Sequence, residues 1–254
     1  MIMRLSRLLN ATLFLLSALI LWWLLSRYYN SPLFPGPAST LFALIDVFSL
    51  RESWYHVGVT AYRVFAGVAL GSVIGTACGL FPRYSRVAED IVQSVIHPLF
   101  ESVPSICWAL IFATWFGLSD TTPILIVFVA VTPFFIINVW EGLKEIDESL
   151  IEMAMSFTRD RVRILRKVVL PMLYPYLFSA FKIAFEVAWK VVIIGELFGA
   201  ISGVGYMLNI AYEVFAIERV FAWTVCCAAI IILFDYGIFS YIDRRYMRRW
   251  RRAQ

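Results

Sequence analysis

Long apolar stretches alternate with short charged segments along the 254-residue chain. Four uncharged runs, each 18 to 20 residues long, cover residues 8–26, 64–82, 102–119 and 121–140. A helix needs roughly 20 residues to cross the hydrocarbon core of a bilayer, so each run is long enough to span a membrane. Two further stretches are apolar apart from a few charges. The pattern therefore predicts six membrane helices, at 10–26, 58–81, 102–118, 121–140, 172–198 and 220–242.

The spans are expected to be helices and not strands. Membrane strands would show alternation over about ten residues with turn residues between them, whereas these runs are continuously apolar. The first span could be a cleaved signal peptide. No small-residue cleavage site follows it, however, and Trp22, Trp23 and Arg27 are typical of an interfacial belt. We expect a retained helix and an all-α, polytopic membrane protein.

Composition supports this class. The chain is 61% hydrophobic and 16% charged, with a mean hydropathy of +0.78, against about 45–50% and about 25% in a typical soluble chain. This excess of apolar residues is too large to bury in one globular core. Secreted, disordered, fibrous and nucleic-acid-binding classes are therefore excluded.

The basic residues predict the orientation. With six spans both termini lie on one side, and that side would hold sixteen of the 22 Lys and Arg residues. They are Arg4, Arg7, Arg83, Arg86, Lys144, Arg159, Arg161, Arg163, Arg166, Lys167, Arg244, Arg245, Arg248, Arg249, Arg251 and Arg252. The positive-inside rule makes this side the cytoplasm. We expect a multi-pass protein of the inner (plasma) membrane with both termini cytoplasmic, and a basic C-terminus that fixes orientation and touches anionic lipid headgroups.

No pattern in the chain indicates catalysis or a metal site. The four cysteines all fall inside predicted helices without metal-ligand spacing, and His56 and His97 lie far apart. There is neither a Walker phosphate loop nor a Gly-x-Ser-x-Gly elbow. We therefore expect no catalytic residue, no bound metal and no cofactor in this chain.

The predicted internal loop 141–171 does not read as a simple spacer. It holds six acidic residues, mostly at its start, and six basic residues, mostly at its end. Two short helices are expected, one ending near Thr158 and one running from about Asp160 to Leu170, with Asp160 as a cap and Pro171 opening the next membrane helix. Its apolar positions need a partner or the membrane surface. From the residues alone, a solvated spacer and a docking element are equally supported.

Within this loop, Glu152-Met153-Ala154 followed by Val168, Leu170 and Pro171 resembles the E-A-A motif of ATP-binding-cassette (ABC) importer permeases. Met153 replaces an Ala of that motif. Thr158 replaces a Gly, and Thr adopts a positive φ less readily than Gly does. Four further pieces resemble the sulfonate, taurine and nitrate permease group: Leu33–Pro37, Arg63–Gly67, Val103-Pro104 leading to Trp115–Gly117, and Gly195-Glu196 followed by Gly203–Tyr206.

The resemblance implies a type I permease fold, a single permease domain over 1–254, and a coupling function for the loop. It also implies two cytoplasmic ATPase subunits that bind ATP and Mg, a second and identical permease subunit, and an external substrate-binding protein. The solute would be small and polar, such as a sulfonate, taurine, nitrate or a thiamine-precursor pyrimidine. The coupling residues would be Glu152, Met153, Ala154, Thr158, Val168, Leu170 and Pro171.

Ionisable residues inside membrane spans usually face a bundle interior or a cavity. Lys182, Glu186 and Lys190 recur every four residues on one helix face, so Glu186 can pair with either lysine. Glu186 and Lys190 either line the solute path or neutralise each other at an interface. Lys182 is expected to snorkel towards the cytoplasm. The path candidates are Glu101, Glu186, Trp189 and Lys190, where Glu101 could pair with Lys190.

Near the outer face, the gate candidates are Glu196, Gly203, Gly205 and Tyr206. Arg63 and Asp235 either pair with each other or reach water. An ion-coupled secondary transporter using Glu186 and Lys190 is the alternative function, and a scaffold or lipid-linked enzyme is a third. No inverted repeat, which many secondary transporters contain, is visible in the sequence.

Overall fold

The computed structural model describes residues 2–83, 86–243 and 245, without the side chains of residues 2–8, 11, 86, 88, 93, 97 and 101. Every regular element in this described part is helical. Several predictions fall on side chains outside this described part. They concern Arg4, Arg7, Arg86, His97, Glu101, Arg244, Arg248, Arg249, Arg251 and Arg252.

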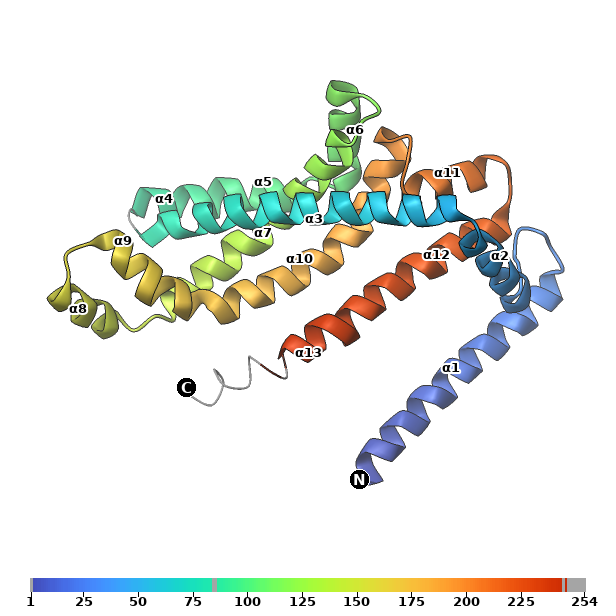
Figure 1. The fold of residues 1–254 in the computed structure, drawn as a ribbon, viewed down its shortest axis with the longest axis horizontal. Coiled ribbons are helices and arrows are strands. Elements are labelled where there is room, and N and C mark those ends of the chain that lie inside the picture. The colour runs from blue at the N-terminus through green and yellow to red at the C-terminus, as the bar shows by residue number, and fades with distance from the viewer. Residues whose placement is uncertain (1, 84–85, 244, 246–254) are drawn as a thin grey trace.

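Long helices make up the body of the molecule, and shorter ones lie beside them or connect them (Figure 1). The long elements are α1 (Ile2–Tyr29), α3 (Arg51–Leu80), α7 (Thr121–Lys144), α10 (Leu170–Gly199) and α12 (Ile217–Ile232). The shorter ones are α2 (Pro37–Ser49), α4 (Arg86–Ile91), α5 (His97–Ser102), α6 (Ser105–Phe116), α8 (Glu148–Phe157), α9 (Arg161–Ile164), α11 (Val204–Glu213) and α13 (Ser240–Ile242). Tighter or wider turns form η1 (Phe81–Arg83), η2 (Val92–Ile96), η3 (Leu165–Val169) and η4 (Leu233–Phe239).

Among the described residues, four helical stretches are long and apolar enough to cross a membrane, and two bent pairs raise the number to six. One bent pair corrects the predicted span 102–118. There, Glu89–Phe100 and Ser105–Phe116 meet at 83°. The cause is Pro104, because a residue before proline is driven out of the helical region, and Val103 is extended with φ −87° and ψ 118°. The 12 residues of α6 reach only about 18 Å, too little to cross alone.

The core of the molecule is the contact of α3 with α7 and α10. Gly67, Gly71, Gly75 and Gly79 recur every four residues along α3 and let its backbone approach α7 closely. A Cβ at Gly71 would lie only 2.4 Å from Val131 Cγ2. The stripe of glycines therefore sets the distance between these two helices.

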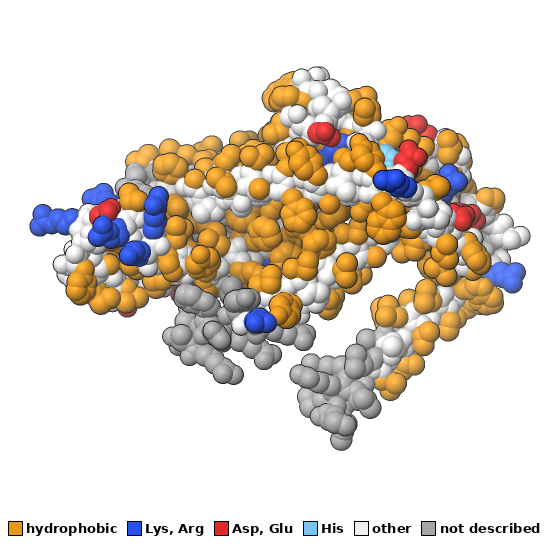
Figure 2. Space-filling model, in the orientation of Figure 1, with side chains coloured by type: hydrophobic (Ala, Val, Ile, Leu, Met, Phe, Trp, Pro, Cys, Tyr) orange, Lys and Arg blue, Asp and Glu red, His pale blue; other side chains and the backbone are white. Residues whose placement is uncertain are grey.

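Helix α1 stands apart from this core (Figure 1). Most of its large apolar side chains are exposed in the single chain, as the orange surface in Figure 2 shows. Trp22 holds it to the rest, since Nε1 of Trp22 donates to the Pro35 carbonyl at 3.0 Å and its ring stacks on Phe221. An apolar helix with this exposure requires lipid or another protein around it.

The two ends of the molecule differ in character. Helices α8 and α9 form one end, and α2, α11 and the turns beside them form the other (Figure 1). The long helices α3, α7 and α10 connect the two ends. The candidate sites below lie at both ends and along α10.

Candidate functional site

The loop predicted to couple to a partner forms two capped helical segments. Asp147 begins α8 by accepting a hydrogen bond from the Ser149 amide at 2.9 Å, and this bond lowers the pKa of its carboxyl. Asp160 begins α9 by accepting from the amides of Val162 and Arg163 at 3.0 and 3.2 Å. The predicted break near Thr158 and the Asp160 cap are confirmed. Thr158 is extended, with φ −155° and ψ 139°, so this turn needs no positive φ.

The second of these helices does not stop at Leu170 as predicted. Residues Arg161–Gly199 form one continuous helical stretch through η3 into α10. Pro171 lies in the first turn of α10, directly after the wider π-type turn of η3. Such a wide turn accommodates a proline because the register of its hydrogen bonds is already shifted. Segment α9 is thus rigidly joined to a membrane helix.

Helix α8 shows one anchored and one free side. Ile151 is buried against Val139, Leu173 and their neighbours. Met153 and Phe157 are exposed, Phe157 to 84%, and Glu152 is exposed as well. The remaining candidate coupling residues Ala154, Thr158, Val168, Leu170 and Pro171 are all half-buried. The free side of α8 has the exposed apolar groups expected of a docking surface.

Along α10, the charged residues do not pair as the sequence suggested. Lys182 forms an ion pair with Asp235 of η4 at 2.7 Å. Asp235 and Arg63 therefore have different partners. Glu186 is half-buried and Lys190 is exposed. Within the described residues Glu186 forms no ion pair with Lys190 or with Lys182, which binds Asp235 instead.

Trp189, the other path candidate on α10, is buried. It is 1% exposed and lies in the core with Phe185 and Phe234. A helix turns 100° per residue, so neighbouring side chains point in different directions. Lys190 faces the surface of the chain, and Trp189 faces the core. Trp189 therefore reaches no surface of the single chain that a solute could touch, which corrects its expected place beside Glu186 and Lys190.

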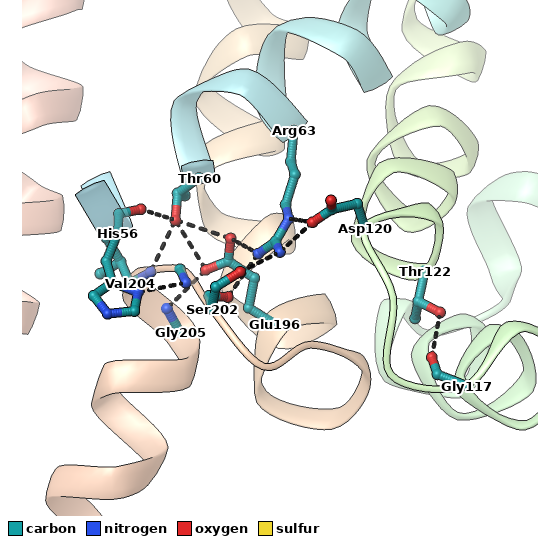
Figure 3. A network of polar contacts seen from close by, with 11 residues as sticks. His56, Thr60, Arg63, Gly117, Asp120, Thr122, Glu196, Ser202, Val204 and Gly205 are labelled. Atoms are coloured by element: carbon teal, nitrogen blue, oxygen red, sulfur yellow. Dashed lines mark hydrogen bonds and ion pairs between the residues drawn. The ribbon is translucent and has the colours of Figure 1, made fainter. Parts of the chain in front are cut away.

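At the other end, a buried polar network surrounds Arg63 of α3 (Figure 3). Its Nε and Nη2 donate to Asp120 Oδ1, and Nη1 donates to Glu196 Oε1 at 2.8 Å. Nη1 also donates to the Ser202 carbonyl at 2.7 Å and Nη2 to Ser202 Oγ at 2.8 Å. A guanidinium has five N–H donors, and all five are used. Arg63, which is 1% exposed, therefore has no donor left for a solute in this conformation.

Glu196 is the second centre of the network and is also completely buried. Its carboxylate accepts from the Gly205 amide at 2.8 Å and from Thr60 Oγ1 at 2.9 Å. Gly203 has φ +106°, and a Cβ there would lie 2.3 Å from the Glu196 carboxyl. Only glycine fits at this position, for both conformational and steric reasons.

The turn before α11 is also held to α3. The Gly203 amide donates to His56 Nδ1 at 3.0 Å, which requires that this nitrogen carry no proton. The Val204 amide donates to Thr60 Oγ1 at 2.8 Å, and Tyr206 packs its ring near His56. The network thus fastens the end of α10 and its following turn to α3, and Asp120 adds the start of α7.

Three of the four predicted gate residues, Glu196, Gly203 and Gly205, belong directly to this network, and Tyr206 borders it. The sequence did not indicate Asp120, Ser202, His56 or Thr60. One signal was present, since Arg63 and Glu196 are opposite charges in two apolar spans, and such charges usually pair. Their pairing required knowledge of which helices are neighbours.

A cleft of about 740 Å³ opens beside the network, with Glu52, Tyr55, Tyr206 and Ile210 among its lining residues. Within the described residues there is no group of three or more His, Cys, Asp or Glu side chains that could hold a metal ion. The polar groups here bind one another and join α3 to the start of α7 and to the end of α10.

Apolar helices long enough to span a membrane, bent at two points and joined by an exposed helical loop, are typical of a polytopic membrane protein. The chain belongs to the family described as the inner membrane component of binding-protein-dependent transport systems, which matches residues 67–248. It is therefore an ABC transporter permease, and the resemblance seen in the sequence is confirmed.

Relatives cover most of the chain. The taurine transport system permease protein of Escherichia coli (strain K12) is 28% identical over 231 residues, 87% of this chain and 82% of the relative. A Bacillus subtilis (strain 168) protein named for aliphatic sulfonate transport is 26% identical over 226 residues, 88% of this chain and 80% of the relative. A chain of the MetNI methionine ABC transporter, in an inward-facing conformation, matches with TM-score 0.62 and 22% identity, over 75% of this chain and 94% of that one. The fold is thus that of a type I permease.

Proposed function

We propose that this chain is the permease subunit of an importer for a small sulfonate such as taurine, driven by separate cytoplasmic ATPase subunits. The observation that carries the proposal is α8, which exposes Met153 and Phe157 while Ile151 anchors it to the core. Two relatives are named for taurine and aliphatic sulfonate transport, which supports the solute class. ATP and magnesium would be bound by the ATPase subunits and not by this chain.

The continuous helix Arg161–Gly199 supplies the mechanical connection. At 1.5 Å per residue it extends about 58 Å, from the loop that docks on the ATPase to Gly199, three residues beyond Glu196 at the opposite end. A displacement of α8 and α9 would move this rod as a unit. Residues 141–171, with Glu152, Met153, Ala154, Thr158, Val168, Leu170 and Pro171, act as the coupling segment, and the permease domain extends over 1–254.

In this proposal two identical chains enclose the path, with both termini in the cytoplasm. Glu186, Lys190 and Glu101 are the charged candidates for lining the path, because Glu186 and Lys190 keep surface that a solute could reach. Glu196, Gly203, Gly205 and Tyr206 act as the outer gate, held closed here by Arg63. A substrate-binding protein delivers the solute at that end.

Reconstitution with the ATPase subunits and the binding protein tests the proposal. Vesicles should take up taurine only when ATP and Mg²⁺ reach the ATPase. Phe157→Ser should reduce ATPase binding and uptake at least tenfold, because it removes the most exposed apolar group of α8. Tyr212→Ser, at an exposed aromatic residue of α11 at the opposite end, is the matched control and should leave ATPase binding unchanged.

An ion-coupled secondary transporter, the alternative drawn from the sequence, disagrees with the family match, although Glu186 and Lys190 form no ion pair with each other in the described part of the chain. Uptake by this chain alone, driven by a pH gradient and abolished by Glu186→Gln, would establish it in place of the importer. Uptake that needs ATP and is unaffected by the gradient excludes it.

A further inference from the structure

A small pocket lies within the coupling segment, between α8, α9, η3 and the short η1 that follows α3. Its volume is about 240 Å³. Five of its lining residues are apolar and two are arginines, namely Ile151, Met155, Ile164, Leu165, Val169, Arg83 and Arg161. An apolar floor with guanidinium groups at its rim is complementary to a ligand that is anionic at one end and apolar at the other.

The two arginines of the pocket are available for such a ligand. Both side chains are exposed, and within the described residues neither forms an ion pair with a carboxylate. The next arginine of α9, Arg163, is exposed as well but has a carboxylate partner. It lies 3.8 Å from Asp160 and does not line the pocket. Arg83 and Arg161 thus place two guanidinium groups at one opening, and neither group has a carboxylate partner among the described residues.

The pocket also lies at the level of the lipid headgroups. The uncharged run that contains the end of α3 stops at Pro82, directly before Arg83. The uncharged run that leads into α10 begins at Val168, directly after Lys167. The hydrocarbon therefore ends near Arg83 and Val169. Arg161 lies eight residues before Val169, about 12 Å along the helix. A headgroup layer is about 5–8 Å thick on each side of the core, so the pocket opens within and just beyond that layer. Figure 2 shows basic side chains gathered around this end.

We propose that this pocket binds one anionic phospholipid, such as phosphatidylglycerol. The headgroup phosphate lies between the guanidinium groups of Arg83 and Arg161, which pair well with phosphate oxygens. The start of an acyl chain lies on Ile164, Leu165 and Val169. Basic pockets between membrane helices on the cytoplasmic side suit such headgroups, whereas a free phosphate would leave the apolar floor uncovered.

The bound lipid would connect η1, which follows α3, to helices α8 and α9 of the coupling segment. Ile151 and Met155 of α8 line the same pocket, and within the described residues Ile151 is the buried contact of α8 with the core. Occupancy would therefore hold α8 in position for its partner. The lipid site is independent of the solute that the permease carries, and it goes beyond the proposed function.

Native mass spectrometry of the full-length protein tests this site without ATPase or solute, so its outcome is separate from that of the transport assay. The protein, purified in detergent, is titrated with phosphatidylglycerol or phosphatidylcholine. One phosphatidylglycerol should be retained per chain in preference to phosphatidylcholine. Arg83→Gln and Arg161→Gln should each weaken its binding roughly fivefold and the double variant about 25-fold. Inorganic phosphate at the same concentration should not displace the lipid.

Arg163→Gln is the matched control, because it removes the same charge from α9 two residues away from Arg161 but outside the pocket. It should leave phosphatidylglycerol binding unchanged. Equal weakening by Arg163→Gln would show a general effect of charge and overturn the proposal. A double variant that retains phosphatidylglycerol would also overturn the proposal. If a separate binding assay shows that this variant has lost affinity for the ATPase, the occupant is an acidic protein segment. Unfolding temperatures in phosphatidylcholine should be equal for all variants, because these side chains are exposed.

Discussion

Replacing Arg63 with methionine is the most informative perturbation of the network. The change removes all five hydrogen bonds of the guanidinium and keeps a long side chain at the same place. Its two acidic partners are affected differently. Glu196 is 0% exposed and would keep its charge in a buried place without a cation, whereas Asp120 is 63% exposed and can turn to water.

The structure therefore predicts two very different costs. Removing one partner of a buried ion pair lowers the free energy of unfolding by about 3–5 kcal/mol, which we expect for Arg63→Met. An exposed ion pair contributes about 0–1 kcal/mol, which we expect for Asp120→Asn. Adding Glu196→Gln to Arg63→Met removes the stranded charge and keeps an acceptor for the Gly205 amide. The double variant should recover part of the loss, so the two effects should not add.

Denaturant unfolding in detergent, followed by tryptophan fluorescence, measures these differences, since Trp189 and Trp223 are both 1% exposed. Hydrogen exchange at the amides of Gly203, Val204 and Gly205 gives the local readout and should accelerate in Arg63→Met. The reasoning is refuted if Arg63→Met and Asp120→Asn destabilise equally. It is also refuted if the double variant loses as much as the sum of its single changes.

Three further predictions concern packing, backbone conformation and pH. Gly71→Ala should lower the free energy of unfolding by about 1–3 kcal/mol because its Cβ would overlap Val131, whereas Gly58→Ala, with open space around it on the same helix, should be neutral or stabilising. Chemical denaturation compares the two, and equal effects would contradict close packing as the cause. Gly203→Ala should abolish the slow hydrogen exchange of the following turn, because φ +106° and the nearby Glu196 carboxyl both oppose a Cβ; unchanged protection would refute this. The lowered pKa of Asp147 means that its capping contribution is present above the ordinary carboxyl pKa and is lost as pH falls through the lowered value. Protection factors of α8 amides should therefore fall below about pH 4, and an Asp147→Ala variant should lack this pH dependence.

Much of the fold follows from the sequence because burial in lipid imposes a simple rule. Backbone groups must be satisfied within each span, so an apolar run of about 20 residues becomes a helix wherever it is placed. The helices starting near 121 and 172 were predictable for this reason. The break at Thr158 was predictable for another reason, namely the Asp160 cap in the loop between them. The break after residue 102 was also encoded locally, in Val103-Pro104, but apolar length alone concealed it. Helices α2 and α11 were missed because they are too short to cross a membrane.

The sequence by itself determined the class of protein, the positions of most long apolar helices, the capped helical segments of the loop 141–171 and the set of charged residues within the apolar stretches. Only the tertiary structure decided how those charges combine. Arg63 lies 57 residues from Asp120 and 133 from Glu196, and nothing local distinguishes these partners from Asp235. The choice is made by the glycine stripe that brings α3 against α7, and by the bend after Gly199 that returns the chain to α3. Ion pairing depends on distance in space, and in a helical bundle that distance is set by packing between helices and not by their order along the chain.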